Sequence, residues 1–170
     1  FIKYRLLRQS TGYKAMPISV TLLASGIVKT IKNTDPTKPL TGTDKTSYAY
    51  QAIIARKFNN NTTLQLMPTL VHYNLVPKAT DPNDMFSLGI GARQKISRRL
   101  ALTAEYYHQF NKFDGYNSSL ALGVDIETGG HVFQLHFTNS TGMTEPTFIH
   151  ETTGDFFKGD IHFGFKIGRA

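Results

Sequence analysis

Apolar and polar residues alternate with a period of two along most of this sequence, and this pattern constrains the fold more than any other feature. Between Met85 and Ile96, for example, Phe86, Leu88 and Ile90 occupy alternate positions, with small or polar residues between them. Successive side chains of a β-strand point to opposite faces, so the pattern predicts a strand with two unlike faces. Because no segment shows a convincing helical period, the sequence predicts an all-β fold.

The alternation recurs in about nine stretches, each predicted as a strand of roughly 9 to 12 residues. The alternating residues that mark these strands lie at 1–10, 18–25, 48–54, 64–70, 85–96, 100–107, 119–127, 133–138 and 161–168, and the predicted strands extend beyond the shorter of these ranges. Strands of this length are near what a tilted membrane-spanning strand requires and exceed the usual length of about five or six. In the fourth stretch, Pro68 predicts an edge strand or a bulge. Gly89 and Gly91 are expected to relieve crowding on the polar side of the fifth.

The predicted connections alternate between short and long. The short ones are 10–12, 59–61, 97–98 and 128–130, the longer ones are 32–46, 76–84 and 139–158, and 111–117 is of intermediate length. Outer-membrane barrels have short periplasmic turns and longer external loops. The sequence therefore predicts an antiparallel up-and-down transmembrane β-barrel rather than a soluble sandwich.

The alternation also predicts how the chain is organised. We expect residues 1–170 to form a single β-barrel domain with a periplasmic C-terminus, so the first stretch also runs inward. Bacterial single-chain barrels have an even number of strands, so we expect at least one strand before Phe1 and about ten to fourteen in the whole barrel. The signal peptide of an exported protein would also precede this sequence.

In such a barrel the two faces of each strand meet lipid and lumen. The apolar set predicted to face lipid is Phe86, Leu88, Ile90, Leu100, Leu102, Leu120, Leu122, Val124, Phe133, Leu135, Phe137, Ile161, Phe163 and Phe165. The polar set predicted to face the lumen is Arg93, Lys95, Glu105, Tyr107, Asp125, Glu127, Gln134, His136, His162 and Lys166.

The longest predicted connection, 139–158, is unusually apolar for an external loop. It carries Met143, Phe148, Ile149, Phe156 and Phe157. Apolar side chains on a loop need cover. We therefore expect this loop to fold over the barrel mouth as a plug or to dock on a partner.

No residue pattern indicates catalytic or metal chemistry. The chain has no cysteine, which excludes disulfides and thiolate sites, and the 139–158 loop lacks a nucleophile-elbow signature. His136 and His162 are predicted to point inward from adjacent strands, but a third metal ligand is not evident. We therefore predict that the chain is not an enzyme and holds no cofactor or metal.

The charge balance is basic, with a formal net charge of +7 and a mean hydropathy of −0.25. Lysine and arginine are scattered rather than clustered, and no nucleic-acid reader motif is present, so nucleic acid is not an expected partner. The expected partners are outer-membrane lipid and other outer-membrane proteins.

Three segments resemble a family of uncharacterised outer-membrane β-barrel proteins from Bacteroidota. They are PISVTLLASG at 17–26, GHVFQLHFTNSTGMTE at 130–145 and GDIHFGF at 159–165. The similarity is sharpest over roughly the last forty residues. It implies a barrel in the bacterial outer membrane and carries no known activity.

Three hypotheses for the function follow. The first is a structural or accessory outer-membrane barrel, of the kind that serves as a subunit of a larger envelope complex. The second is a porin-like pore for small, anionic solutes, which the basic balance favours. The third is a soluble lipocalin-like binder, which requires an apolar interior and a polar exterior.

Overall fold

The computed structural model describes residues 1–30 and 40–169. Within these residues nine strands form one antiparallel sheet in which each strand pairs with the next along the chain. The strands are β1 (Ile2–Leu7), β2 (Ser19–Val28), β3 (Thr46–Lys57), β4 (Thr62–Tyr73), β5 (Asp84–Lys95), β6 (Leu100–Gln109), β7 (Leu120–Thr128), β8 (His131–Thr138) and β9 (His162–Arg169). The predicted all-β, up-and-down fold and the predicted number of strands are confirmed.

The strands in the middle of the sheet have the predicted length, with twelve residues each in β3, β4 and β5. The outer ones are shorter than predicted, with six residues in β1 and eight each in β8 and β9. In β1 the register shifts between Arg5 and Leu7, which interrupts its pairing with β2.

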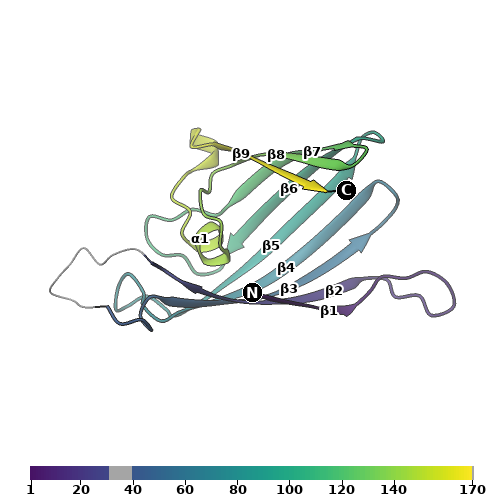
Figure 1. The fold of residues 1–170 in the computed structure, drawn as a ribbon. Helices are drawn as coiled ribbons and strands as arrows, with labels where there is room; N and C mark the ends of the chain where they lie inside the picture. Colours follow the sequence, from purple (N-terminus) through teal and green to yellow (C-terminus); the bar gives the residue numbers. More distant parts are fainter. Residues whose placement is uncertain (31–39, 170) are drawn as a thin grey trace.

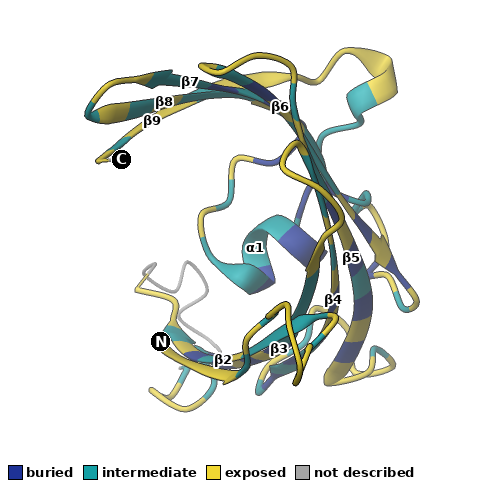
Figure 2. Ribbon diagram, turned by 90° about the vertical axis from the view of Figure 1, so that its right-hand side faces the viewer, coloured by how far each residue is buried: buried dark blue, intermediate teal, exposed yellow. Residues whose placement is uncertain are grey.

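The sheet curves strongly and forms an open trough (Figures 1 and 2). In the strand order β1 and β9 are its two edges, and among the described residues they do not pair with each other. Besides the strands the fold contains a short helix, α1 (Glu145–His150), and a 3₁₀ turn, η1 (Phe156–Lys158). Both lie between β8 and β9, and α1 is inside the trough (Figure 2).

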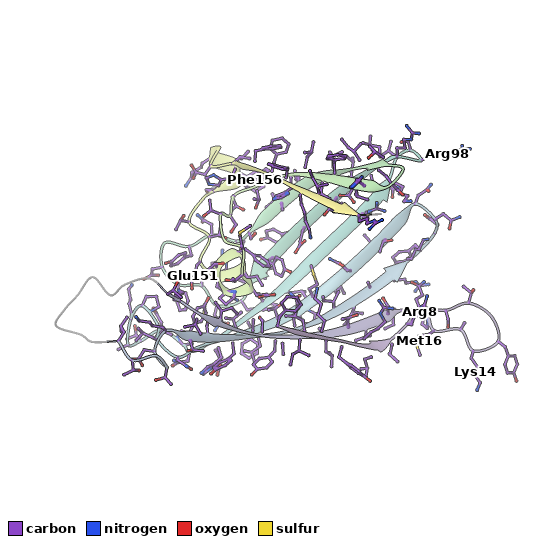
Figure 3. The ribbon with its side chains drawn as sticks, viewed as in Figure 1. Arg8, Lys14, Met16, Arg98, Glu151 and Phe156 are labelled. Carbon is purple, nitrogen blue, oxygen red and sulfur yellow. The ribbon has the colours of Figure 1, made fainter. Side chains whose placement is uncertain are left out.

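The connections separate by length between the two ends of the sheet, with one exception. Short turns at 58–61, 96–99 and 129–130 lie at one end, and longer loops at 74–83, 110–119 and 139–161 lie at the other. Much of the predicted 32–46 loop lies outside the described residues. In Figure 3, Lys14 and Arg98 mark the end with the short turns and Glu151 the opposite end.

The exception is the connection from β1 to β2, where the predicted tight turn at 10–12 is wrong. The strands end and begin at Leu7 and Ser19, so the connection spans 8–18. The Ser10 amide donates to the Met16 carbonyl at 3.0 Å. This bond closes a wider loop, in which Gly12 at φ 108° supplies a left-handed bend rather than the centre of a hairpin.

The prediction of an edge strand or bulge at Pro68 is also wrong. The register is the same on both sides of the proline, with Gln51 opposite Thr69 and Ile54 opposite Leu66, and only the pairs between them are missing. Proline cannot donate a ladder hydrogen bond, so the pairing lapses locally on the β3 side while β4 stays paired with β5 throughout.

The buried core lies on the concave side of the sheet. One cluster consists of Ala49, Val71, Tyr73, Met85 and Phe113. A second joins Met67 of β4 and Tyr107 of β6 to Ile149 of α1. The fold therefore buries side chains inside the trough and leaves the apolar residues of its convex side exposed or half-exposed.

Candidate functional site

The convex side of the sheet carries the residues predicted to face lipid. None of them is buried: the exposed fraction is 50% for Phe86 and 48% for Phe137, for example. Outward residues also meet across strands, as Phe137 does with Phe163 at a ring separation of 5.5 Å. Ile161 is exposed too but precedes β9 rather than lying within it. A soluble lipocalin-like binder needs the opposite arrangement, with a polar exterior.

The concave side carries the residues predicted to face the lumen. Tyr107 and Asp125 are buried, and His162 and Lys166 are exposed on the edge strand β9. The remaining six are half-buried: Arg93, Lys95, Glu105, Glu127, Gln134 and His136.

One half of the trough, along β2 to β6, is filled by α1. The helix begins after Thr144, whose backbone amide donates to Thr147 Oγ1 at 3.1 Å, and Pro146 lies in its first turn. Proline is tolerated there because the first amides of a helix have no partner within it. Ile149 is fully buried against Met67 and Tyr107. The α1 segment therefore occupies the interior rather than the rim.

Four polar contacts hold this segment to the surrounding wall. They are Ser25 Oγ to Glu145 Oε2 (3.0 Å), Tyr73 Oη to the Pro146 carbonyl (3.2 Å), Gln109 Nε2 to the Ile149 carbonyl (2.6 Å), and Lys29 Nζ to Glu151 Oε1 (2.7 Å). They come from three strands, β2, β4 and β6, and from Lys29, the residue that follows β2. The docked position is thus fixed from several sides.

The apolar residues predicted as a plug or partner surface divide between these two roles. Phe148 and Ile149 pack inside the trough, with the Phe148 ring 5.4 Å from that of Tyr107 in an edge-on arrangement. Phe156 is half-buried, whereas the exposed fractions of Met143 and Phe157 are 96% and 89%. The loop therefore fills the interior and still presents apolar side chains outside.

His150 is buried in α1 together with Pro146 and Ile149. It is fully buried, and neither ring nitrogen has a hydrogen-bond partner among the described residues. Burial lowers its pKa to about 4, because a charged imidazolium is poorly solvated there. The imidazole is therefore neutral when α1 is docked at neutral pH.

The other half of the trough, along β5 to β9, is polar and open. Arg93 Nε and Gln134 Nε2 both donate to Asp125, at 2.9 Å and 3.1 Å. Two neighbouring hollows of about 590 and 460 Å³ lie on this face. They share Glu105, Ala121 and His136, so they form one continuous depression.

Glycines let side chains lie flat against the wall of this depression. A Cβ on Gly89 would be 2.5 Å from the Tyr107 ring, and one on Gly164 would be 2.3 Å from His136 Nε2. Both distances are too short for real contacts. The predicted role of Gly89 in relieving crowding is thus confirmed, and Gly164 plays the same part on β9.

The two histidines considered as metal ligands are offset in the sheet. His136 pairs with Gly164, while His162 pairs with Thr138. In the part of the chain that the structure describes, no group of three or more potential metal ligands gathers.

An antiparallel up-and-down sheet with an apolar convex face, and a concave face that is polar along β5 to β9, is the arrangement of the class of membrane β-barrel proteins. The chain belongs to the family described as a membrane bound beta barrel domain (DUF5777), whose model matches residues 1–170. No curated protein and no solved structure matches the chain. No helix among the described residues is long and apolar enough to cross a membrane.

Proposed function

We propose that this chain is an outer-membrane β-barrel protein with a structural or accessory role, acting as a subunit of a larger envelope complex. The observation that carries the proposal is the occupied trough: Ile149 and His150 of α1 have exposed fractions of 0%. In barrels of small size the interior is filled by side chains rather than left as a channel. A curved sheet whose concave side is occupied by a loop of the same chain is better suited to anchoring and assembly than to transport.

The outer membrane is the proposed location because of the fold and the family. Single-chain β-barrels with short turns at one end and long loops at the other are typical of that membrane. The resemblance of 130–145 to outer-membrane barrels of Bacteroidota supports the same location.

The exposed apolar side chains of the long loop support the proposed complex. Met143 and Phe157 flank α1 in sequence and project from the loop, with exposed fractions of 96% and 89%. Aromatic residues and methionine are enriched at protein interfaces. We propose that these two residues belong to the surface that meets another envelope protein.

Gentle detergent extraction followed by identification of co-purifying proteins tests this role. We expect envelope proteins to co-purify with the wild type and to be lost when Met143→Ser and Phe157→Ser are combined. Tyr13→Ser is the matched control, because Tyr13 is fully exposed in the 8–18 loop, at the opposite end of the sheet. A wild-type protein that extracts as a monomer without partners would contradict the proposal.

A pore for small solutes is the second candidate, favoured by the continuous depression beside α1. It predicts discrete conductance steps when the purified protein is inserted into planar lipid bilayers. Recordings without such steps would remove this candidate and leave the accessory role standing.

A further inference from the structure

Glu105 is an acidic side chain without a counter-ion in the polar half of the trough. It belongs to the lining of both hollows and is half-buried. Among the residues that the structure describes, no cationic side chain forms an ion pair with it, whereas Arg93 is engaged by Asp125 at 2.9 Å. A half-buried carboxylate is costly unless a partner compensates its charge.

The sheet leaves room beside this carboxylate. The register places Gly91 on one side of Glu105 and Ala121 on the other, so neither direct neighbour has a side chain larger than a methyl group. The Gln65 side chain lies flat over Gly91, since a Cβ on that glycine would be 2.6 Å from Gln65 Nε2. A primary amide thus lies next to the open space above Glu105.

The larger hollow combines this charge with aromatic surface. Its lining includes Glu105, His136, Tyr107 and Phe148, the last contributed by α1. Glu105 is its only acidic residue, and its lining contains no lysine or arginine, although the chain as a whole is basic. A carboxylate beside aromatic rings is the arrangement that recognises organic cations. A divalent metal ion would require several further oxygen or nitrogen ligands, and no such group gathers among the described residues.

We infer that Glu105 anchors a binding site for a small primary ammonium compound. The ammonium group donates hydrogen bonds to the Glu105 carboxylate and to the Gln65 or His136 side chain. The alkyl part lies along Tyr107 and Phe148. This preference for cations is opposite to the preference for anions that the basic composition suggests. The local charge of the hollow, rather than the net charge of the chain, decides which ligand is favoured.

Isothermal titration of the detergent-solubilised protein with n-butylammonium chloride, in a phosphate buffer free of amines, tests this inference. We expect saturable binding to the wild type and at least tenfold weaker binding to Glu105→Gln. The matched control is Glu127→Gln, a half-buried acid on the same face that lines neither hollow, for which we expect an affinity within twofold of the wild type.

Two further measurements distinguish a charge-selective site from apolar partitioning and from a loss of folding. n-Butanol, which has the same alkyl chain without the charge, is expected not to bind, and circular dichroism is expected to show the same strand content in all three proteins. Absence of binding to the wild type, equal binding of n-butanol, or equal weakening by both substitutions would each overturn the inference.

Discussion

Small residues on the concave face determine how closely neighbouring strands and side chains approach. A Cβ on Gly123 would lie 2.6 Å from Thr103 Oγ1 and 2.9 Å from the Leu135 carbonyl oxygen. The hydroxyl can rotate away, but the carbonyl belongs to the β7–β8 ladder and cannot move without disturbing the sheet. A side chain at position 123 would therefore collide with the backbone. At Gly164 it would meet only the His136 side chain, which can move.

We predict that Gly123→Ala lowers the free energy of unfolding by about 1–3 kcal/mol, the usual cost of overpacking. Gly168→Ala is the control, because a Cβ there meets nothing within 4 Å, and we expect it to be neutral or slightly stabilising. Urea denaturation in detergent micelles measures both. Equal effects of the two substitutions would show that the close contact at Gly123 is not what matters.

The buried imidazole of His150 predicts a pH dependence. Its pKa is about 4 with α1 docked and 6.5 when exposed, so the undocked state binds a proton more readily. The neutral imidazole therefore contributes to the free energy of docking, and this contribution is fully present above pH 6.5 and is lost as the pH falls towards 4. It amounts to about 3 kcal/mol.

A spin label on Met143→Cys reports this effect, because the chain contains no other cysteine. We expect its mobility to rise as the pH falls from 7 to 4.5, and to stay constant when His150→Leu is added. If the leucine variant shows the same rise, the imidazole is not the group that titrates.

At the scale of elements, α1 packs on the sheet through Ile149, which is fully buried against Met67 and Tyr107. We predict that Ile149→Ala weakens docking by about 2–4 kcal/mol, as for other large-to-small core substitutions. The undocked loop should then be cleaved faster by trypsin after Lys158, an exposed residue of η1. Met143→Ala, a substitution in the same loop at an exposed position, should leave the cleavage rate unchanged. Cleavage at the same rate in both variants would contradict this account of the docking.

The edge strands β1 and β9 carry backbone groups that no described strand pairs with. Unpaired backbone groups are too costly to face lipid, so the expectation of further strands stays a prediction. Hydrogen exchange on the protein in lipid bilayers tests it: the backbone amides of β9 that point away from β8 should be as protected from exchange as the amides of β8. Rapid exchange confined to β1 and β9 would mean that the edges stay open.

Most of the sheet could be predicted because each strand meets two different environments. Alternation places the strand positions and assigns residues such as Phe86 and Arg93 to opposite faces. The exceptions are local. The sequence STG at 10–12 has the composition of a tight turn, but it lies inside the wider loop at 8–18.

The candidate site was predictable only in part. The apolar composition of 139–158 indicates that something must cover it, yet the six residues of α1 are too few for a helical period to stand out. Burial of His150 gives no sequence signal, because histidine is usually only partly buried. The lack of a counter-ion at Glu105 depends on the register between β5 and β6, which alternation alone cannot determine.

The whole molecule is a curved sheet with α1 inside its trough (Figure 2). It has three distinct surfaces: an apolar convex face, a part of the trough filled by α1, and a polar depression beside it. Its central physical requirement is that the convex face meets hydrocarbon. The exposed fractions of Phe86, Ile90 and Phe165 lie between 47% and 69%, and we expect an apolar face of this kind to be covered by lipid rather than water.

Spin labels placed one at a time along β5, from Met85 to Ala92, test this requirement most directly in lipid bilayers. The account predicts that accessibility to oxygen, which concentrates in hydrocarbon, peaks at 86, 88 and 90, and that accessibility to a water-soluble nickel chelate is lowest at the same positions. Oxygen maxima at 85, 87 and 89, or high nickel accessibility at Phe86 and Ile90, would contradict it.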